Sequence, residues 1–113
     1  MNIKDAKTQF LEYIEIEKGL SLKTVRNYDH YLSRFFEFAK VGHTSDISES
    51  NLREFRLYLN RLTGVKVRGQ SSAGMKKNTQ NYHLIALRSF LKYMMKRGVT
   101  TLSPEKIELA KTA

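Results

Sequence analysis

Side chains that bind phosphates and base edges are concentrated in one part of this chain of 113 residues. Residues 64–98 contain eight lysines and arginines and no aspartate or glutamate, whereas the rest of the chain contains twelve basic and eleven acidic residues. Nearly all of the net charge of +9 therefore arises in this one stretch. A localised excess of cations is typical of a surface that faces a polyanion. The sequence predicts that this region binds nucleic acid.

Short amide and hydroxyl side chains accompany the cations, both here and in residues 23–34. Lysine and arginine neutralise phosphates, whereas asparagine and threonine hydrogen-bond phosphate oxygens and base edges. Both clusters include the start of a predicted helix, where free backbone N–H groups favour phosphate. Asn27, Asn78, Thr79 and Asn81 are the candidates for base edges or for phosphate bonds that set the register. The full set of candidate DNA-binding residues is Lys23, Thr24, Arg26, Asn27, Arg34, Lys76, Lys77, Asn78, Thr79, Asn81, Arg88, Lys92 and Lys96.

Other kinds of functional site find little support in the sequence. Cysteine is absent, which excludes disulfides, thiolate metal sites and cysteine nucleophiles. His30, His43 and His83 lie in different segments without metal-ligand spacing. His83 is interpreted first as an ordinary helix-face residue near the basic end, with contact to phosphate or a base edge as the less favoured alternative. A nucleotide-binding phosphate loop requires lysine directly after the second glycine, where this chain has Met75. We expect no catalytic residues, no metal and no cofactor.

Four helices are predicted to position the candidate residues, at about 3–18, 22–39, 49–62 and 78–97. Ser21 and Ser48 precede the second and third as N-caps, and Gly19 and Gly98 follow the first and fourth as C-terminal stops. A chain of this length with 41% hydrophobic residues is expected to form one folded domain over residues 1–113. The predicted fold class is all-α.

The apolar residues of these segments repeat with helical period. The first three segments each have one stripe, formed by Ile3, Ala6, Phe10 and Ile14, by Leu22, Val25, Tyr28, Leu32, Phe35, Phe36 and Ala39, and by Leu52, Phe55, Leu59 and Leu62. The fourth is apolar around most of its circumference, which predicts neighbours on several sides. Its polar stripe is interrupted by Ile85 and consists of Asn78, Asn81, Arg88, Lys92 and Lys96. Residues 41–63 carry as many acids as bases and are predicted to be structural.

The segments outside the four helices are short. Residues 64–76 are predicted to form a basic loop rich in glycine and serine. Ser103, Pro104 and Glu105 form a helix-start pattern, but so few residues follow that we interpret it as the beginning of a connection. The chain has no apolar run long enough to span a membrane and no signal-peptide core, so we expect a soluble, cytoplasmic protein without a membrane partner.

Several short motifs, in this order, are shared with a known family. They are Phe10–Ile14, Gly19–Tyr28, Leu32, Phe35, Phe36, Asn81, Leu84, Ala86–Tyr93, Gly98 and Ser103–Pro104. In these residues the chain resembles the N-terminal core-binding (SAM-like) domain of phage integrases and Xer-type tyrosine recombinases. The resemblance spans nearly the whole chain.

The resemblance implies a four-helix SAM-like bundle that forms one half of a C-shaped clamp on double-stranded DNA. The second and fourth helices would approach the major groove of a recombination half-site. A C-terminal catalytic domain with the tyrosine nucleophile would follow where this chain ends, so none of the present tyrosines is expected to be catalytic and this part alone is not expected to be an enzyme. The implied partners are duplex DNA, that catalytic domain and other recombinase protomers. The loop at 64–76 is longer than the family's usual connection.

Two alternatives remain open at this point. The chain would be a stand-alone helical DNA-binding regulator if it preferred a half-site without any catalytic partner. It would be a protein-interaction bundle, with Ile85 and Met95 packing against a neighbouring subunit, if it dimerised without affinity for DNA.

Overall fold

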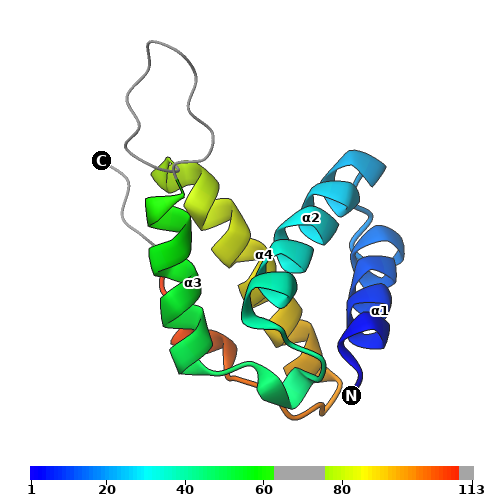
Figure 1. Cartoon of the computed structure of the whole chain (residues 1–113). Coiled ribbons are helices and arrows are strands. Elements are labelled where there is room, and N and C mark those ends of the chain that lie inside the picture. The colour runs from blue at the N-terminus through cyan, green and yellow to red at the C-terminus, as the bar shows by residue number, and fades with distance from the viewer. Residues whose placement is uncertain (63–75, 110–113) are drawn as a thin grey trace.

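The structure is a computed structural model that describes residues 1–62 and 76–109. It contains the helices α1 (Ile3–Ile16), α2 (Leu22–Ala39), α3 (Glu49–Arg61) and α4 (Lys77–Lys96), with single 3-10 turns at Thr44–Asp46 and Pro104–Lys106 (Figure 1). These four helices, with no β-strand in the described residues, confirm the all-α prediction. The predicted loop lies outside the described residues except for Lys76. In the described part of the chain, no helix has both the length and the apolar character that a membrane span requires.

The predicted helix boundaries are confirmed by local hydrogen bonds and backbone angles. The hydroxyl of Ser21 accepts a hydrogen bond from the backbone N–H of Thr24 at 3.2 Å, and Ser48 accepts one from Asn51 at 3.2 Å. Such N-caps satisfy donors that have no partner within the helix. Gly19 and Gly98 adopt φ angles of 66° and 73°, the left-handed region in which a side chain would be strained. Sequence-local chemistry therefore sets where these helices begin and end.

Helix α4 is the central element of the bundle. The α1–α2 hairpin flanks it on one side and α3 on the other (Figure 1), and α4 contacts all three helices. Nine α4 residues are buried, which confirms that this helix has neighbours on several sides. The ring of Phe90 is completely buried, with its centroid 5.6 Å from that of Phe10 on α1 and 5.4 Å from that of Phe36 on α2. Aromatic packing thus joins α4 to the hairpin and holds its polar stripe in a defined orientation.

One residue of the predicted apolar stripes and one further apolar residue of α4 are exposed. The side chains of Leu22 and Met95 are each 60% exposed. Leu22 is the first residue of α2, and Met95 lies in the last turn of α4. Helical period assigns a residue to a face, but it does not tell how far the neighbouring helix extends along that face.

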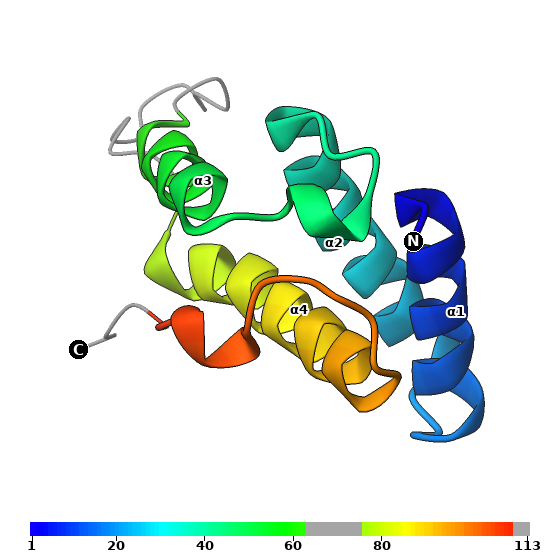
Figure 2. The ribbon, with the colours of Figure 1, turned by 90° about the horizontal axis from the view of Figure 1, so that it is seen from below.

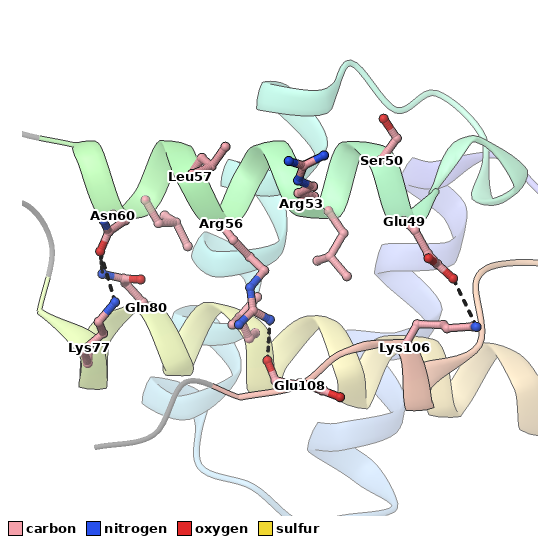
Figure 3. A pocket seen from close by; sticks show the side chains of 13 residues that line it. Glu49, Ser50, Arg53, Arg56, Leu57, Asn60, Lys77, Gln80, Lys106 and Glu108 are labelled. Carbon is pink, nitrogen blue, oxygen red and sulfur yellow. Dashed lines mark hydrogen bonds and ion pairs between the residues drawn. The ribbon is translucent and has the colours of Figure 1, made fainter. Parts of the chain in front are cut away.

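The C-terminal segment begins its helical turn where predicted. Ser103 occupies the N-cap position, although without a side-chain hydrogen bond, Pro104 is the first residue of a short 3-10 turn, and Glu105 follows within it. The described part of this segment runs back along α4 (Figure 2), and Ile107 is only 2% exposed within the core, a placement that the sequence did not predict. The guanidinium of Arg56 on α3 donates a hydrogen bond to the backbone carbonyl of Glu108 (Figure 3). Burial of an apolar side chain outweighs the weak helical preference of so short a segment.

Candidate nucleic-acid interface

A groove between α2 and α4 brings together residues from the two helices predicted to bind DNA. Both helices begin at the same end of the molecule (Figure 1). The groove, called the α2–α4 groove below, has a volume of about 220 Å³ and is lined by Thr24, Asn27, Tyr28, Tyr31, Tyr82 and Ile85. Two predicted site residues of α2, Thr24 and Asn27, therefore share this groove with Tyr82 and Ile85 of α4. The spacing of residues within each helix did not predict which residues of α2 and α4 would face each other.

A second hollow continues along α4 and carries lysines. It has a volume of about 420 Å³ and includes Lys92 and Lys96 of α4 together with Lys18 at the end of α1. Its wall also contains Tyr28, which lines the α2–α4 groove as well, so the two hollows adjoin. The ammonium groups of Lys18 and Lys96 lie 5.8 and 5.4 Å from the ring centroid of Tyr13. We call Lys18, Lys92 and Lys96 the basic flank of the groove.

Lys18 was missed in the sequence analysis. It is far from the cation-rich stretch in the chain, and only the packing of α1 against α4 brings it close to Lys96. Its position directly before the stop at Gly19, at the junction into α2, was the one available signal. The shared cation–π contacts with the ring of Tyr13 bring the two ammonium groups to one place on the molecule.

The cations of this face keep their charge available to a ligand. Across residues 1–62 and 76–109, ion pairs join Lys7 to Asp29 at 2.8 Å and Lys106 to Glu49 at 3.1 Å. Neither pair involves a predicted phosphate-binding residue or the basic flank. A set of exposed cations without neighbouring acids produces a positive potential that attracts polyanions.

The other predicted residues surround the groove or lie away from it. Lys23 and Arg26 are exposed on α2, Lys76 and Asn78 are exposed at the start of α4, and Arg34, Thr79, Asn81 and Arg88 are partly buried. Lys77 faces another element: its ammonium group donates a hydrogen bond to the side-chain oxygen of Asn60 on α3 at 3.1 Å (Figure 3). The structure therefore separates Lys77 from the α2–α4 groove, although it adjoins Asn78 in sequence.

The hollow that contains Lys77 is larger but less suited to a polyanion. It lies between α3, α4 and the C-terminal segment, has a volume of about 660 Å³, and includes the acidic residues Glu49 and Glu108 (Figure 3). Several of its cations are engaged, because Lys106 pairs with Glu49 and Arg56 donates to the carbonyl of Glu108. Within the described ranges, no three histidine or carboxylate side chains are arranged to hold a metal ion.

His83 is a buried residue, so its proposed contact with phosphate or bases is wrong. Its side chain is only 2% exposed, and its ring centroid lies 4.5 Å from that of Tyr31 on α2. Nδ1 donates a hydrogen bond to the backbone carbonyl of Thr79 at 2.8 Å, while Nε2 has no partner among the described residues. Burial lowers the pKa of His83, the hydrogen bond to Thr79 opposes this, and the charges of Arg34 and His30 lower the pKa further. The neutral ring thus supports Tyr31 from behind the α2–α4 groove.

The lowered pKa of His83 predicts a loss of stability in acid. As the pH is lowered through the ordinary histidine pKa of about 6.5, the unfolded chain takes up a proton before the folded one does. The free energy of unfolding therefore decreases as the pH decreases. The effect is absent at higher pH, where both states are neutral. Urea unfolding measures the free energy of unfolding of wild type and of His83→Leu at each pH. Between pH of about 7 and about 5, we expect this free energy to decrease less in His83→Leu than in wild type. Equal losses would contradict a neutral, buried His83.

Comparison with known proteins identifies the family of this bundle. Residues 8–98 match the family model described as phage integrase, N-terminal SAM-like domain. The chain belongs to this family. Membership confirms the resemblance based on the motifs of α1, α2 and α4, and the SAM-like domain accounts for most of the chain. No solved structure gives a significant match.

Curated relatives of this SAM-like domain are named as tyrosine recombinases. Tyrosine recombinase XerC of Anoxybacillus flavithermus is 28% identical over 103 residues, which cover 91% of this chain and 32% of that protein. XerC of Vibrio vulnificus is 34% identical over 98 residues, covering 87% of this chain and 28% of that protein. XerD of Rhizobium meliloti is 29% identical over 95 residues, which cover 84% of this chain and 28% of that protein. The chain thus spans about a third or less of the length of these relatives.

Proposed function

We propose that this chain is the DNA-binding N-terminal part of a tyrosine recombinase and holds duplex DNA at a recombination half-site through α2 and α4. Strand breakage and rejoining would be carried out by a C-terminal catalytic domain. Other protomers of the recombinase, bound to neighbouring half-sites, would be its protein partners. In this proposal the protein works in the cytoplasm and its own contribution is binding without chemistry.

The observation that carries the proposal is the joint placement of polar and basic residues from α2 and α4. Thr24 and Asn27 line the α2–α4 groove opposite α4, and Lys92 and Lys96 extend the same face into the basic flank. Phosphate contacts fix the position and orientation of a protein on a duplex, whereas side chains in the groove recognise bases. A face with cations around a central groove provides both kinds of contact.

Family membership supports the proposal from a second direction. The curated relatives are tyrosine recombinases, enzymes that act on DNA. The alternatives are weaker by comparison. The stand-alone regulator would explain the localised charge, but neither alternative explains the similarity over most of the chain. The protein-interaction bundle remains the alternative that the experiment below separates.

Fluorescence anisotropy of a labelled random-sequence duplex, titrated with the chain at several salt concentrations, tests the proposal. If six to eight cations neutralise phosphates, the slope of log K against log salt is expected to be about −5 to −7, from about −0.9 per phosphate. The measurement is most informative between about 50 and 200 mM salt, where such a slope changes the affinity by orders of magnitude.

A folded, monomeric chain that fails to bind duplex at low salt would contradict the proposal. Circular dichroism establishes that the chain is folded, and sedimentation establishes whether it is monomeric. Concentration-dependent dimerisation without affinity for duplex would instead favour the protein-interaction bundle.

A further inference from the structure

Two hydrophobic side chains lie in the middle of the proposed DNA-binding face. Ile85 interrupts the polar stripe of α4, one helical turn after Asn81 and one before Arg88. It lines the α2–α4 groove together with Tyr82, which is 51% exposed. Phosphates offer no reason for an isoleucine at this position, and the proposed function has so far left it unexplained.

Core packing does not explain these two residues. Tyr28 and Tyr31, on the opposite wall of the groove, pack against the buried core formed by the described residues, whereas Tyr82 and Ile85 do not. Tyr82 stacks on Tyr31 instead, with ring centroids 6.4 Å apart and ring planes inclined by 27°. A single exposed hydrophobic residue needs no explanation. This pair, however, would lose water whenever the surrounding cations and amides contact a duplex.

The wall that faces Ile85 is held in place. The ring of Tyr31 lies against His83, whose Nδ1 is bound to the carbonyl of Thr79 on α4. The aromatic side of the groove is therefore fixed relative to both helices. A preformed groove of this kind loses little conformational entropy when it is filled.

The chemistry of duplex DNA restricts what can fill an apolar groove on a cationic face. Among the groups that base pairs present in the major groove, the C5-methyl of thymine is the apolar one. The paired adenine presents N6 and N7, which an asparagine amide contacts with two hydrogen bonds. The groove offers an apolar surface for the methyl group, formed by Ile85 and Tyr82, and an amide for the adenine, since Asn27 lies on the facing helix.

We propose that the α2–α4 groove recognises an A·T base pair in the major groove, with Ile85 and Tyr82 contacting the thymine methyl and Asn27 hydrogen-bonding the adenine. The inference rests on the proposed function and deepens it, since it assigns sequence preference to one part of the DNA-binding face. The basic flank then supplies affinity that does not depend on sequence.

Uracil substitution provides the test. The preferred duplex is first enriched from a random pool by repeated binding to the chain, and each thymine is then replaced in turn by uracil, which lacks only the C5-methyl. At one position, uracil is expected to weaken binding by about 4-fold. This factor corresponds to the free energy gained when one methylene-sized group is removed from water. Because Tyr82 also contacts the methyl in this proposal, Ile85→Ala is expected to reduce the difference between the thymine and uracil duplexes, and Ile85→Ala with Tyr82→Ala to abolish it.

Matched variants separate this effect from a general loss of binding. Met95→Ala removes a hydrophobic side chain of α4 that lies outside the groove and is more exposed than Ile85, and it should keep the full preference for thymine over uracil. Replacing the paired adenine with 7-deazaadenine, which lacks the N7 acceptor, should weaken binding by wild type but not by Asn27→Ala. Thermal melting checks that each variant is folded.

The outcomes distinguish this inference from the proposed function. No salt-dependent binding to any duplex would contradict the proposed function itself. Normal salt-dependent binding with no enriched sequence, or with equal affinity for thymine and uracil at every position, would overturn the recognition of an A·T pair alone. A preference for thymine that persists when both Ile85 and Tyr82 are replaced by alanine would also overturn it.

Discussion

Replacing Arg88, Lys92 and Lys96 together with glutamine is expected to weaken binding to a random-sequence duplex by about 10²- to 10³-fold at a salt concentration of about 0.1 M. The three residues lie on one stripe of α4, and Lys92 and Lys96 belong to the basic flank. Each phosphate contact that is lost should also reduce the salt slope by about 0.9, so the triple variant should be less steep than wild type by about 3. Anisotropy across a salt series measures both quantities.

A charge-matched variant is the control for this result. Lys4, Lys40 and Arg53 are exposed and lie outside the α2–α4 groove and the basic flank. Lys4 is at the start of α1, and Lys40 directly follows α2, away from its N-terminal end (Figure 1). Replacing these three with glutamine lowers the net charge by the same amount but should leave the salt slope nearly unchanged. Equal losses in the two triple variants would show that binding depends on net charge alone.

Phe90→Ala is expected to lower the free energy of unfolding by about 3–5 kcal/mol. The ring of Phe90 is completely buried and contacts Phe10 and Phe36, so its removal leaves a cavity between α4 and the α1–α2 hairpin. Domains of this size are stable by only about 5–15 kcal/mol. The loss corresponds to a fall in melting temperature of more than about 10 °C, which calorimetry measures directly.

Met95→Ala on the same helix is the comparison for Phe90→Ala. Its side chain is 60% exposed, so truncation should change the free energy of unfolding by less than about 0.5 kcal/mol. If the two variants were equally stable, α4 would not be packed against the hairpin as described. Duplex binding by Phe90→Ala, measured well below its melting temperature, should remain salt-dependent, because the substitution removes no charge.

Local sequence patterns were sufficient to predict the helices and much of the core. Ser21, Ser48, Gly19 and Gly98 act within one or two turns of the chain, so their effect on helix ends can be read directly from the sequence. Helical period likewise identified Phe10, Leu32 and Phe55 as core residues. The C-terminal turn also begins where predicted, but the burial of Ile107 was not predicted, because it depends on packing against the rest of the core rather than on its own neighbours in sequence.

The sequence by itself determined that this protein is a helical bundle with a concentrated positive charge and a polar stripe on its last long helix. Only the tertiary structure decided which residues share that face. It placed Lys18 beside Lys96, turned Lys77 toward Asn60, buried His83 behind Tyr31, and set Asn27 opposite Ile85. The physical reason is that helical period fixes where a side chain lies around its own axis. Which helix it then faces depends on how core side chains from distant segments pack together.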